Sequence, residues 1–324
     1  MDVDTGSDDA IALVLAMSDP EIDLQGVCSV NGNLEVSLTT DNTLRVVECC
    51  RAQERVKVYR GCEYPLVCTL QKGTGQYGVI PKRESAVSDT VVHRKQVPLP
   101  APSIQAQEES AVSWMIRMLL QSDGDITVVA VGPLTNLAAA MRADARIIDK
   151  IQEIIIMGGG HKRSGLCSAA AEFNVWCDPE AMEIVLQSGC PITMVPLDAT
   201  YHAKMGEEEA KRIAAIGTPE AKLVSDLIGQ RIEGYRNGYG AEAVTEGVPV
   251  HDALAVCAAI HPQVLQDVKR CNMHVDLGKG YAYGRTVIDT RDCEYSEAAN
   301  VSFAMGADRE RFVNWVMDTL EKKA

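Results

Sequence analysis

The chain has 324 residues, with an apolar content of 46% and a charged content of 23%. This is the composition of a globular protein and excludes an intrinsically disordered chain. The formal net charge is -14 and the pI is about 4.9, so we expect no nucleic-acid partner, because a phosphate backbone needs a basic surface.

Membrane and disulfide signals are absent from the sequence. No apolar run approaches the roughly 20 residues of a membrane span, so we expect no membrane partner. The 11 cysteines are odd in number, form no Cys-x-x-Cys pair, and lie in apolar segments, as at Cys49, Cys50 and Cys257. Such cysteines indicate free thiols in a reducing compartment, and no signal peptide precedes the first motif. We therefore predict a cytoplasmic protein.

Apolar runs typical of buried strands alternate with helical patterns along the chain. The predicted strands are Ile22–Val30, Val56–Tyr59, Ile126–Val131, Ile151–Met157 and Pro191–Leu197, followed by the shorter Met273–Leu277, Thr286–Asp289 and Val301–Ala304. The predicted helices are Ala10–Met17, Glu35–Cys50, Glu108–Gln121, Leu134–Met141, Pro179–Gln187, Ala221–Gly234 and Arg309–Leu320. This order predicts an α/β fold in which residues 1–324 form a single domain, with an open, mainly parallel sheet flanked by helices. The segment Gly61–Gln107 has no clear period and predicts a long surface excursion.

The most informative segment is Asp2–Ala10, which contains four carboxylates at a predicted strand-to-helix junction. Asp2 and Asp4 would share one face of the strand, and Asp8 and Asp9 would enter the first helical turn. Carboxylates packed this closely repel one another unless a cation joins them. Oxygen ligands of this kind suit Ca²⁺ or Mg²⁺. The alternative, in which Asp8 and Asp9 only favour the helix N-terminus, explains fewer of the four.

Three later segments carry further polar groups to the same sheet edge. His251 and Asp252 open an apolar helix, so Asp252 could complete a metal site and His251 could share a proton with a substrate beside it. An ordinary helix cap with an exposed histidine is the alternative. Val131 ends a strand and would present its carbonyl at the edge. Glu172 and Asn174 stand two residues apart on a segment predicted to be extended, a spacing that suits sugar hydroxyls.

Six motifs in order resemble the nucleoside hydrolase family, of the inosine–uridine-preferring type. They are DVDTGSDDA, VGPLTNLA, IIIMGGG, AEFNVWCDPEA, VPLDAT and VHDALAV, and they span Asp2 to Val256. The resemblance implies an open, mainly parallel sheet with Ca²⁺ at its carboxyl edge. It also implies hydrolysis of ribonucleosides to ribose and free base, and a homodimer or homotetramer.

Carried over onto this sequence, the resemblance implies four calcium ligands. They are the carboxylates of Asp4, Asp9 and Asp252 and the carbonyl of Val131. Asp4 would be the general base for the calcium-bound water, and His251 would assist departure of the base. The sugar would be bound by Asp8, Asn33, Glu172, Asn174 and Asp252. Of these, Asp8 and Asn174 would hold the 2′ and 3′ hydroxyls, and Glu172 the 5′-hydroxyl.

Two departures from the family pattern leave the preferred nucleobase open. His161–Ala171 contains no asparagine, and Gly73–Gly78 lacks the histidine and aspartate that the family often has near the base. Tyr235 and Tyr239 are further candidates for base contacts. These departures motivate an alternative, a nucleoside-binding protein with weak or lost activity. A second alternative is an aspartate-dependent phosphatase, because Asp2 and Asp4 imitate the Asp-x-Asp start of that class.

Overall fold

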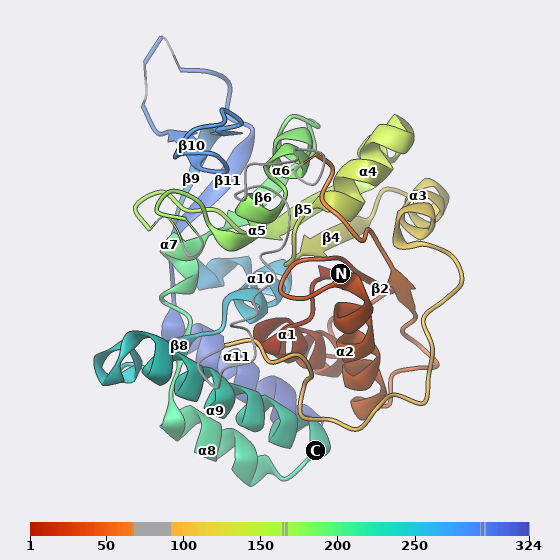
Figure 1. The fold of residues 1–324 in the computed structure, drawn as a ribbon, viewed down its shortest axis with the longest axis vertical. Coiled ribbons are helices and arrows are strands. Elements are labelled where there is room, and N and C mark those ends of the chain that lie inside the picture. Colours follow the sequence, from red (N-terminus) through yellow and green to blue (C-terminus); the bar gives the residue numbers. More distant parts are fainter. Residues whose placement is uncertain (68–91, 164, 166–167, 292, 295, 324) are drawn as a thin grey trace.

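The computed structural model describes residues 1–67, 92–163, 165, 168–291, 293–294 and 296–323. In this part of the chain a nine-stranded sheet has the order β10-β9-β11-β6-β5-β4-β1-β2-β3 (Figure 1). Its strands are β1 (Asp2–Val3), β2 (Val27–Ser29), β3 (Val58–Arg60), β4 (Ile126–Ala130), β5 (Ile151–Met157), β6 (Ile192–Val195), β9 (Leu265–Val275), β10 (Thr286–Asp289) and β11 (Val301–Ala307). The strands from β11 to β3 pair in parallel, and only β9 pairs antiparallel, with β11 and β10. The predicted fold class is therefore confirmed.

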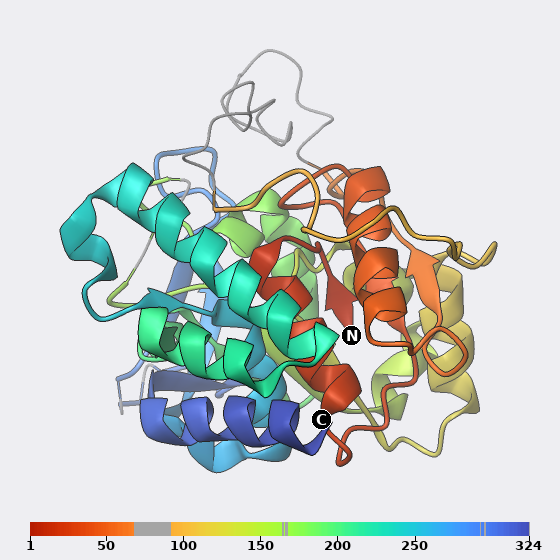
Figure 2. The same cartoon turned by 90° about the horizontal axis from the view of Figure 1, so that it is seen from below.

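Helices cover both faces of the sheet. On one face lie α1 (Ser7–Ser18), α2 (Val36–Cys49), α7 (Leu197–Thr200), α8 (Glu207–Ile216), α9 (Pro219–Tyr239), α10 (His251–Ile260) and α11 (Arg309–Lys322). On the other lie α3 (Ala111–Gln121), α4 (Thr135–Ala143), α5 (Phe173–Cys177) and α6 (Pro179–Leu186). Figure 2 shows α8 in green, α9 in teal and α11 in blue on the first side. No helix in the described residues is long and apolar enough to span a bilayer.

Strand periodicity explains how one sheet supports two hydrophobic cores. In β5, Ile155 and Met157 pack in the core with α1 and α10, whereas Ile154 and Ile156 pack in the core with α4 and α6. Successive side chains of a strand point to opposite faces, so a strand buried on both sides is a continuous apolar run. This is the reason that Ile151–Met157 was predicted with its observed bounds.

Several element boundaries differ from the sequence prediction. The strand predicted at Ile22–Val30 begins only at Val27, where hydrogen bonding to β1 and β3 starts. The helix predicted from Glu108 begins at Ala111, because the Ser110 hydroxyl accepts a hydrogen bond from the Ser113 N–H and caps it. The helix α8 and the short antiparallel pair of β7 (Lys204–Met205) and β8 (Val248–Pro249) were not predicted.

The order of the strands creates a switch point between β1 and β4. From β1 the chain proceeds to β2 and β3 on one side, and from β4 to β5 and β6 on the other. At such a point the loops after the two strands diverge and leave a crevice at the carboxyl edge of the sheet. Asp4 follows β1 and Val131 follows β4, so both stand at this crevice.

Candidate active site

The first motif folds back on itself at the start of α1. The carboxylate of Asp9 accepts hydrogen bonds from the backbone N–H groups of Asp4 and Gly6, both at 3.0 Å. These contacts satisfy donors that the turn leaves without backbone partners before the helix begins. The strand β1 ends at Val3, so Asp4 stands just beyond it. Asp2 takes a different partner, the Asn136 side chain at 2.8 Å.

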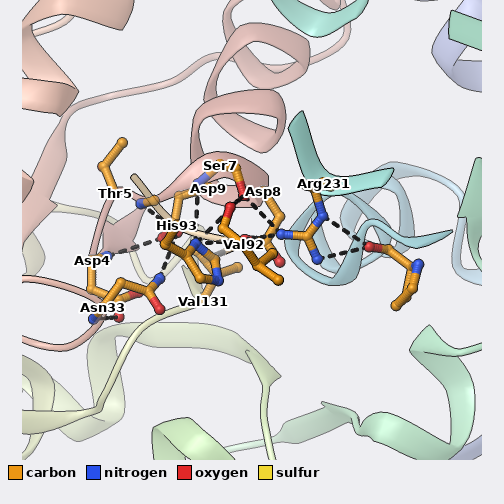
Figure 3. A network of polar contacts seen from close by, with 12 residues as sticks. Asp4, Thr5, Ser7, Asp8, Asp9, Asn33, Val92, His93, Val131 and Arg231 are labelled. Carbon is orange, nitrogen blue, oxygen red and sulfur yellow. Dashed lines mark hydrogen bonds and ion pairs between the residues drawn. The ribbon is translucent and has the colours of Figure 1, made fainter. Parts of the chain in front are cut away.

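Asn33 ties the loop after β2 to this motif (Figure 3). Its backbone N–H donates to Asp4 Oδ2 at 2.6 Å, and its side-chain Nδ2 donates to Asp9 Oδ2 at 3.2 Å. Gly32 makes the approach feasible, because a Cβ at this position would stand 2.0 Å from Asp4 Oδ2. The structure therefore brings Asn33, Asp4 and Asp9 together.

Asp252 reaches the same place from the far end of the chain. It lies in the first turn of α10, whose residues from His251 to Ala258 are all buried. One carboxylate oxygen from each of Asp8, Asp9 and Asp252 lies within 4.8 Å of the other two. Residues separated by more than 240 positions thus form one buried acidic cluster.

The acidic cluster fits a divalent cation. Asp4 is not one of the three clustered side chains, but its backbone N–H binds Asp9, and its Oδ1 is buried and accepts no hydrogen bond from the described residues. Burial, followed by repulsion from Asp9, raises the pKa of Asp4 well above its usual range. Burial and repulsion from Asp8 and Asp9 likewise raise the pKa of Asp252 well above its usual range. Burial and repulsion from Asp8 raise the pKa of Asp9 to about 6. Carboxylates held this close without a counter-charge are unfavourable, and a hard cation removes the penalty.

Asp8 differs from the other three aspartates because it has a cationic partner. Its Oδ1 lies 3.0 Å from Nη1 of Arg231 and 3.7 Å from Nδ1 of His93. Burial opposes ionisation of Asp8, but the charges of Arg231 and His93 hold its pKa below the usual value. Asp8 is therefore an anionic member of the acidic cluster, and its carboxylate faces Arg231 (Figure 3).

Val131 and Asn174 meet across the crevice. The Nδ2 of Asn174 donates to the carbonyl oxygen of Val131 at 2.7 Å and to that of Met157 at 3.1 Å. Asn174 thereby joins the ends of β4 and β5. The predicted metal ligand Val131 and the predicted sugar ligand Asn174 are in direct contact.

The segment around Glu172 was predicted to be extended, and this is wrong. Residues Phe173–Cys177 form the short helix α5, and Glu172 is its N-cap. The Glu172 carboxylate accepts from the backbone N–H groups of Asn174 at 3.0 Å, Val175 at 3.2 Å and Gly159 at 3.0 Å. A side chain able to satisfy three N–H groups favours the helical turn over an extended chain. The Glu172 carboxylate is thus bound to backbone N–H groups.

His251 is buried beside the cluster and is held by neighbouring side chains. Its Nδ1 lies 2.7 Å from the Thr200 hydroxyl, and its ring packs edge-on against Tyr201 with centroids 5.7 Å apart. Burial lowers the pKa of His251 to about 3, so the ring is neutral at pH 7. The exposed-histidine alternative is therefore wrong.

Sequence reasoning missed three side chains that define this site, namely Arg231, His93 and Thr200. Arg231 carried a signal, because it occupies an apolar stripe of α9 that also contains Leu227, Ile228 and Ile232. A charged residue on a core-facing stripe indicates a buried ion pair. Of the candidate base contacts, Tyr235 is buried and Tyr239 is exposed. The segment Gly73–Gly78 lies outside the described residues.

A buried carboxylate cluster at the switch point of an α/β sheet can bind a cation where such folds bind their ligands. Residues 1–314 match the family model of the inosine-uridine preferring nucleoside hydrolase, and the chain belongs to this family. Membership confirms the predicted enzyme class, a hydrolase that cleaves the N-glycosidic bond of ribonucleosides. It lends no support to the phosphatase alternative.

Individual relatives agree with this assignment over nearly their whole length. The pyrimidine-specific ribonucleoside hydrolase RihA of Shewanella sp. (strain ANA-3) is 34% identical over 320 residues, covering 99% of this chain and 95% of that protein. The pyrimidine-specific ribonucleoside hydrolase RihB of Escherichia coli O17:K52:H18 (strain UMN026 / ExPEC) is 35% identical over 294 residues, covering 89% and 86%. Among solved structures, the purine-preferring ribonucleoside hydrolase from Gardnerella vaginalis has a TM-score of 0.86 at 29% identity, covering 99% and 97%.

Proposed function

We propose that this chain is a calcium-dependent ribonucleoside hydrolase in which Asp4 is the general base and Asp4, Asp9, Asp252 and the Val131 carbonyl are the ligands of the cation. The observation that carries the proposal is the buried cluster of carboxylates, whose mutual repulsion calls for a positive charge. Oxygen ligands of this kind favour Ca²⁺ or Mg²⁺ over softer metals. Bound calcium would lower the pKa of a water and orient the ribose hydroxyls.

The residues of the chain have separate roles in the reaction. Asp4 accepts the proton of the attacking water, and its raised pKa makes it a stronger base than an exposed aspartate. The water forms a bond to the anomeric carbon while the N-glycosidic bond breaks, and the bond pair leaves with the nucleobase. Positive charge develops on the ribose in an oxocarbenium-like transition state. The excess negative charge of the aspartates stabilises it.

The ribose and the leaving base have separate contacts in this proposal. Asp8, Asn33, Asn174 and Asp252 bind the sugar hydroxyls, and Asn174 exchanges its contact with a backbone carbonyl for the sugar. Glu172 binds the 5′-hydroxyl in addition to its backbone partners. His251, neutral at pH 7, stabilises the departing base by hydrogen bonding rather than as an imidazolium.

Replacement of His251 with Gln tests its role at the leaving group. Hypoxanthine and uracil, the bases released from inosine and uridine, are poor leaving groups that need help from the enzyme, whereas p-nitrophenolate is a good leaving group by itself. We expect kcat to fall about 100-fold on the nucleosides, the lower range for general acid–base catalysis, and only a few-fold on p-nitrophenyl riboside. His202→Gln is the matched control, because His202 is exposed on the neighbouring turn. Equal losses of kcat on both substrates would contradict the assignment.

A panel of nucleosides tests the substrate class. The curated relatives at 34% and 35% identity are named as pyrimidine-specific, so we propose uridine and cytidine as the preferred substrates. A site built to bind a hydroxyl rejects the analogue without it by a factor on the order of 10⁴. Release of free base should therefore be fast from uridine, slower from inosine and lower by this factor from 2′-deoxyuridine. Faster release from inosine would overturn the preference, and equal rates on 2′-deoxyuridine would overturn the sugar contacts.

The cysteines indicate the cellular setting of the enzyme. Buried cysteines such as Cys28, Cys50 and Cys257 are free thiols, consistent with the reducing cytoplasm. We propose that residues 1–324 form one catalytic domain, that the enzyme is a homodimer or homotetramer, and that it acts in nucleoside salvage or catabolism.

A further inference from the structure

Arg231 is a fully buried cation that contacts the first motif of the site, at Ser7 and Asp8, and Pro249, the residue before the VHDALAV motif. It projects from the buried face of α9, and its side chain is 1% exposed. Nη1 donates to the Ser7 hydroxyl at 2.9 Å and forms the ion pair with Asp8 at 3.0 Å. Nε and Nη2 both donate to the carbonyl oxygen of Pro249, at 3.1 and 2.8 Å. Figure 3 shows the guanidinium between the start of α1 and the loop before α10.

The two ends of the guanidinium contact two different segments beside the acidic cluster, the start of α1 and the segment before α10. Ser7 and Asp8 begin α1, whereas Pro249 lies two residues before His251 and three before Asp252. A guanidinium is planar and rigid, so the directions of its N–H groups are fixed relative to one another. A shift of α10 relative to α1 would therefore break contacts on one side or the other.

Burial of this cation is costly unless it is paired and hydrogen-bonded. Asp8 supplies the opposite charge, and Ser7 and Pro249 supply neutral acceptors. The Tyr235 ring, 5.9 Å from the guanidinium carbon, adds a further contact. No other arginine in the described residues is among the largest fully buried side chains. Arg231 is thus a buried charge that ties the start of α1 to the segment before α10.

We propose that Arg231 is the positioning residue of the site, which holds the Asp8 carboxylate and the start of α10 in the arrangement that selects ribose over 2′-deoxyribose. This inference rests on the proposed function, because it assumes that Asp8 binds a ribose hydroxyl. In this proposal Arg231 contacts neither the sugar nor the reacting bond. It acts through the direction of Asp8 and through the placement of His251 and Asp252.

The test compares three variants on uridine and 2′-deoxyuridine in saturating calcium. Arg231→Lys keeps the charge but loses the planar fork, and Arg231→Met keeps only the stem. Arg45→Met is the matched control, because Arg45 is also buried, at 7% exposed, and ion-paired with Asp41, away from the acidic cluster. For each variant we would measure kcat, KM and the thermal midpoint.

We expect Arg231→Lys to raise the KM for uridine about tenfold and to lower the preference for uridine over 2′-deoxyuridine about tenfold, which is an ordinary coupling for contacting residues. Arg45→Met should leave this preference unchanged. In an Asp8→Asn background, Arg231→Lys should lower the preference by clearly less than tenfold, because the part of its effect that passes through Asp8 is already lost.

Three results would overturn the inference. One is an equal loss of kcat/KM on both substrates, which a purely structural role predicts. Another is a full additional loss of preference in the Asp8→Asn background. The third is that both Arg231 variants are unfolded at the assay temperature while Arg45→Met is folded, which would make Arg231 a stability residue. Failure of the wild-type enzyme to release base from any riboside would instead overturn the proposed function, so the two failures are distinguishable.

Discussion

Replacement of Asp4 with Asn should lower kcat by about 10³-fold, the effect typical of a lost general base. An amide has the shape of the carboxylate but does not accept the proton of the attacking water at neutral pH. Asp4 Oδ1 is buried and accepts no hydrogen bond from the part of the chain that the structure describes, so this oxygen is available for that proton. The measurement is release of free base from uridine in saturating calcium, which compensates for any weakening of cation binding.

Asp19→Asn is the control for the Asp4 variant. Asp19 is also buried, but it lies at the opposite end of α1 and accepts from Trp315 Nε1 at 2.8 Å and from the Thr319 hydroxyl at 3.1 Å. Its replacement should cost stability and leave kcat close to the wild-type value. Wild-type turnover by the folded Asp4→Asn variant would eliminate Asp4 as the base.

Removal of the cation should be as damaging as the loss of Asp4. A metal contributes several kcal/mol of transition-state stabilisation, so enzyme treated with EDTA should lose about 10³-fold in kcat and recover on addition of calcium. Asp252→Asn should lose a similar factor without recovery at calcium concentrations that saturate the wild type. Full activity after exhaustive chelation would contradict a metal-dependent mechanism.

Asp252→Asn, which should lower activity, should raise the stability of the metal-free protein. Two charges 4.8 Å apart repel by about 3 kcal/mol at an effective dielectric constant of about 20, and Asp252 faces Asp8 and Asp9 within this distance. In EDTA, Asp252→Asn should therefore melt at a higher temperature than the wild type. In calcium the wild type should gain stability by binding the cation, and the variant should gain less. A lower melting temperature of the variant in EDTA would show that the cluster is not under electrostatic strain.

The sequence was sufficient to predict the parts of the site that depend on local pattern. A strand followed by Gly6 and an apolar helix predicted that Asp8 and Asp9 enter the first turn of α1. The alternation of strands and helices predicted that Asp252 would reach the same sheet edge from far along the chain. The comparison with known proteins confirmed the family and the enzyme class on which the remaining assignments rest.

Side-chain partners could not be read from the sequence, because they depend on tertiary packing. Glu172 and Asn174 were expected on an extended segment, but the Glu172 carboxylate caps a short helix. The position of Arg231 on an apolar stripe of α9 can be recognised in the sequence. Its partner Asp8, however, is 223 positions away, and no local rule pairs the two residues. Long-range ion pairs and caps by distant side chains are set by the fold as a whole.

A crystal of the protein grown in calcium tests the central claim most directly through the anomalous signal of the ion. The account predicts one peak per chain, in contact with carboxylate oxygens of Asp4, Asp9 and Asp252. A map without density between these side chains at saturating calcium, or with the ion bound elsewhere, would contradict it.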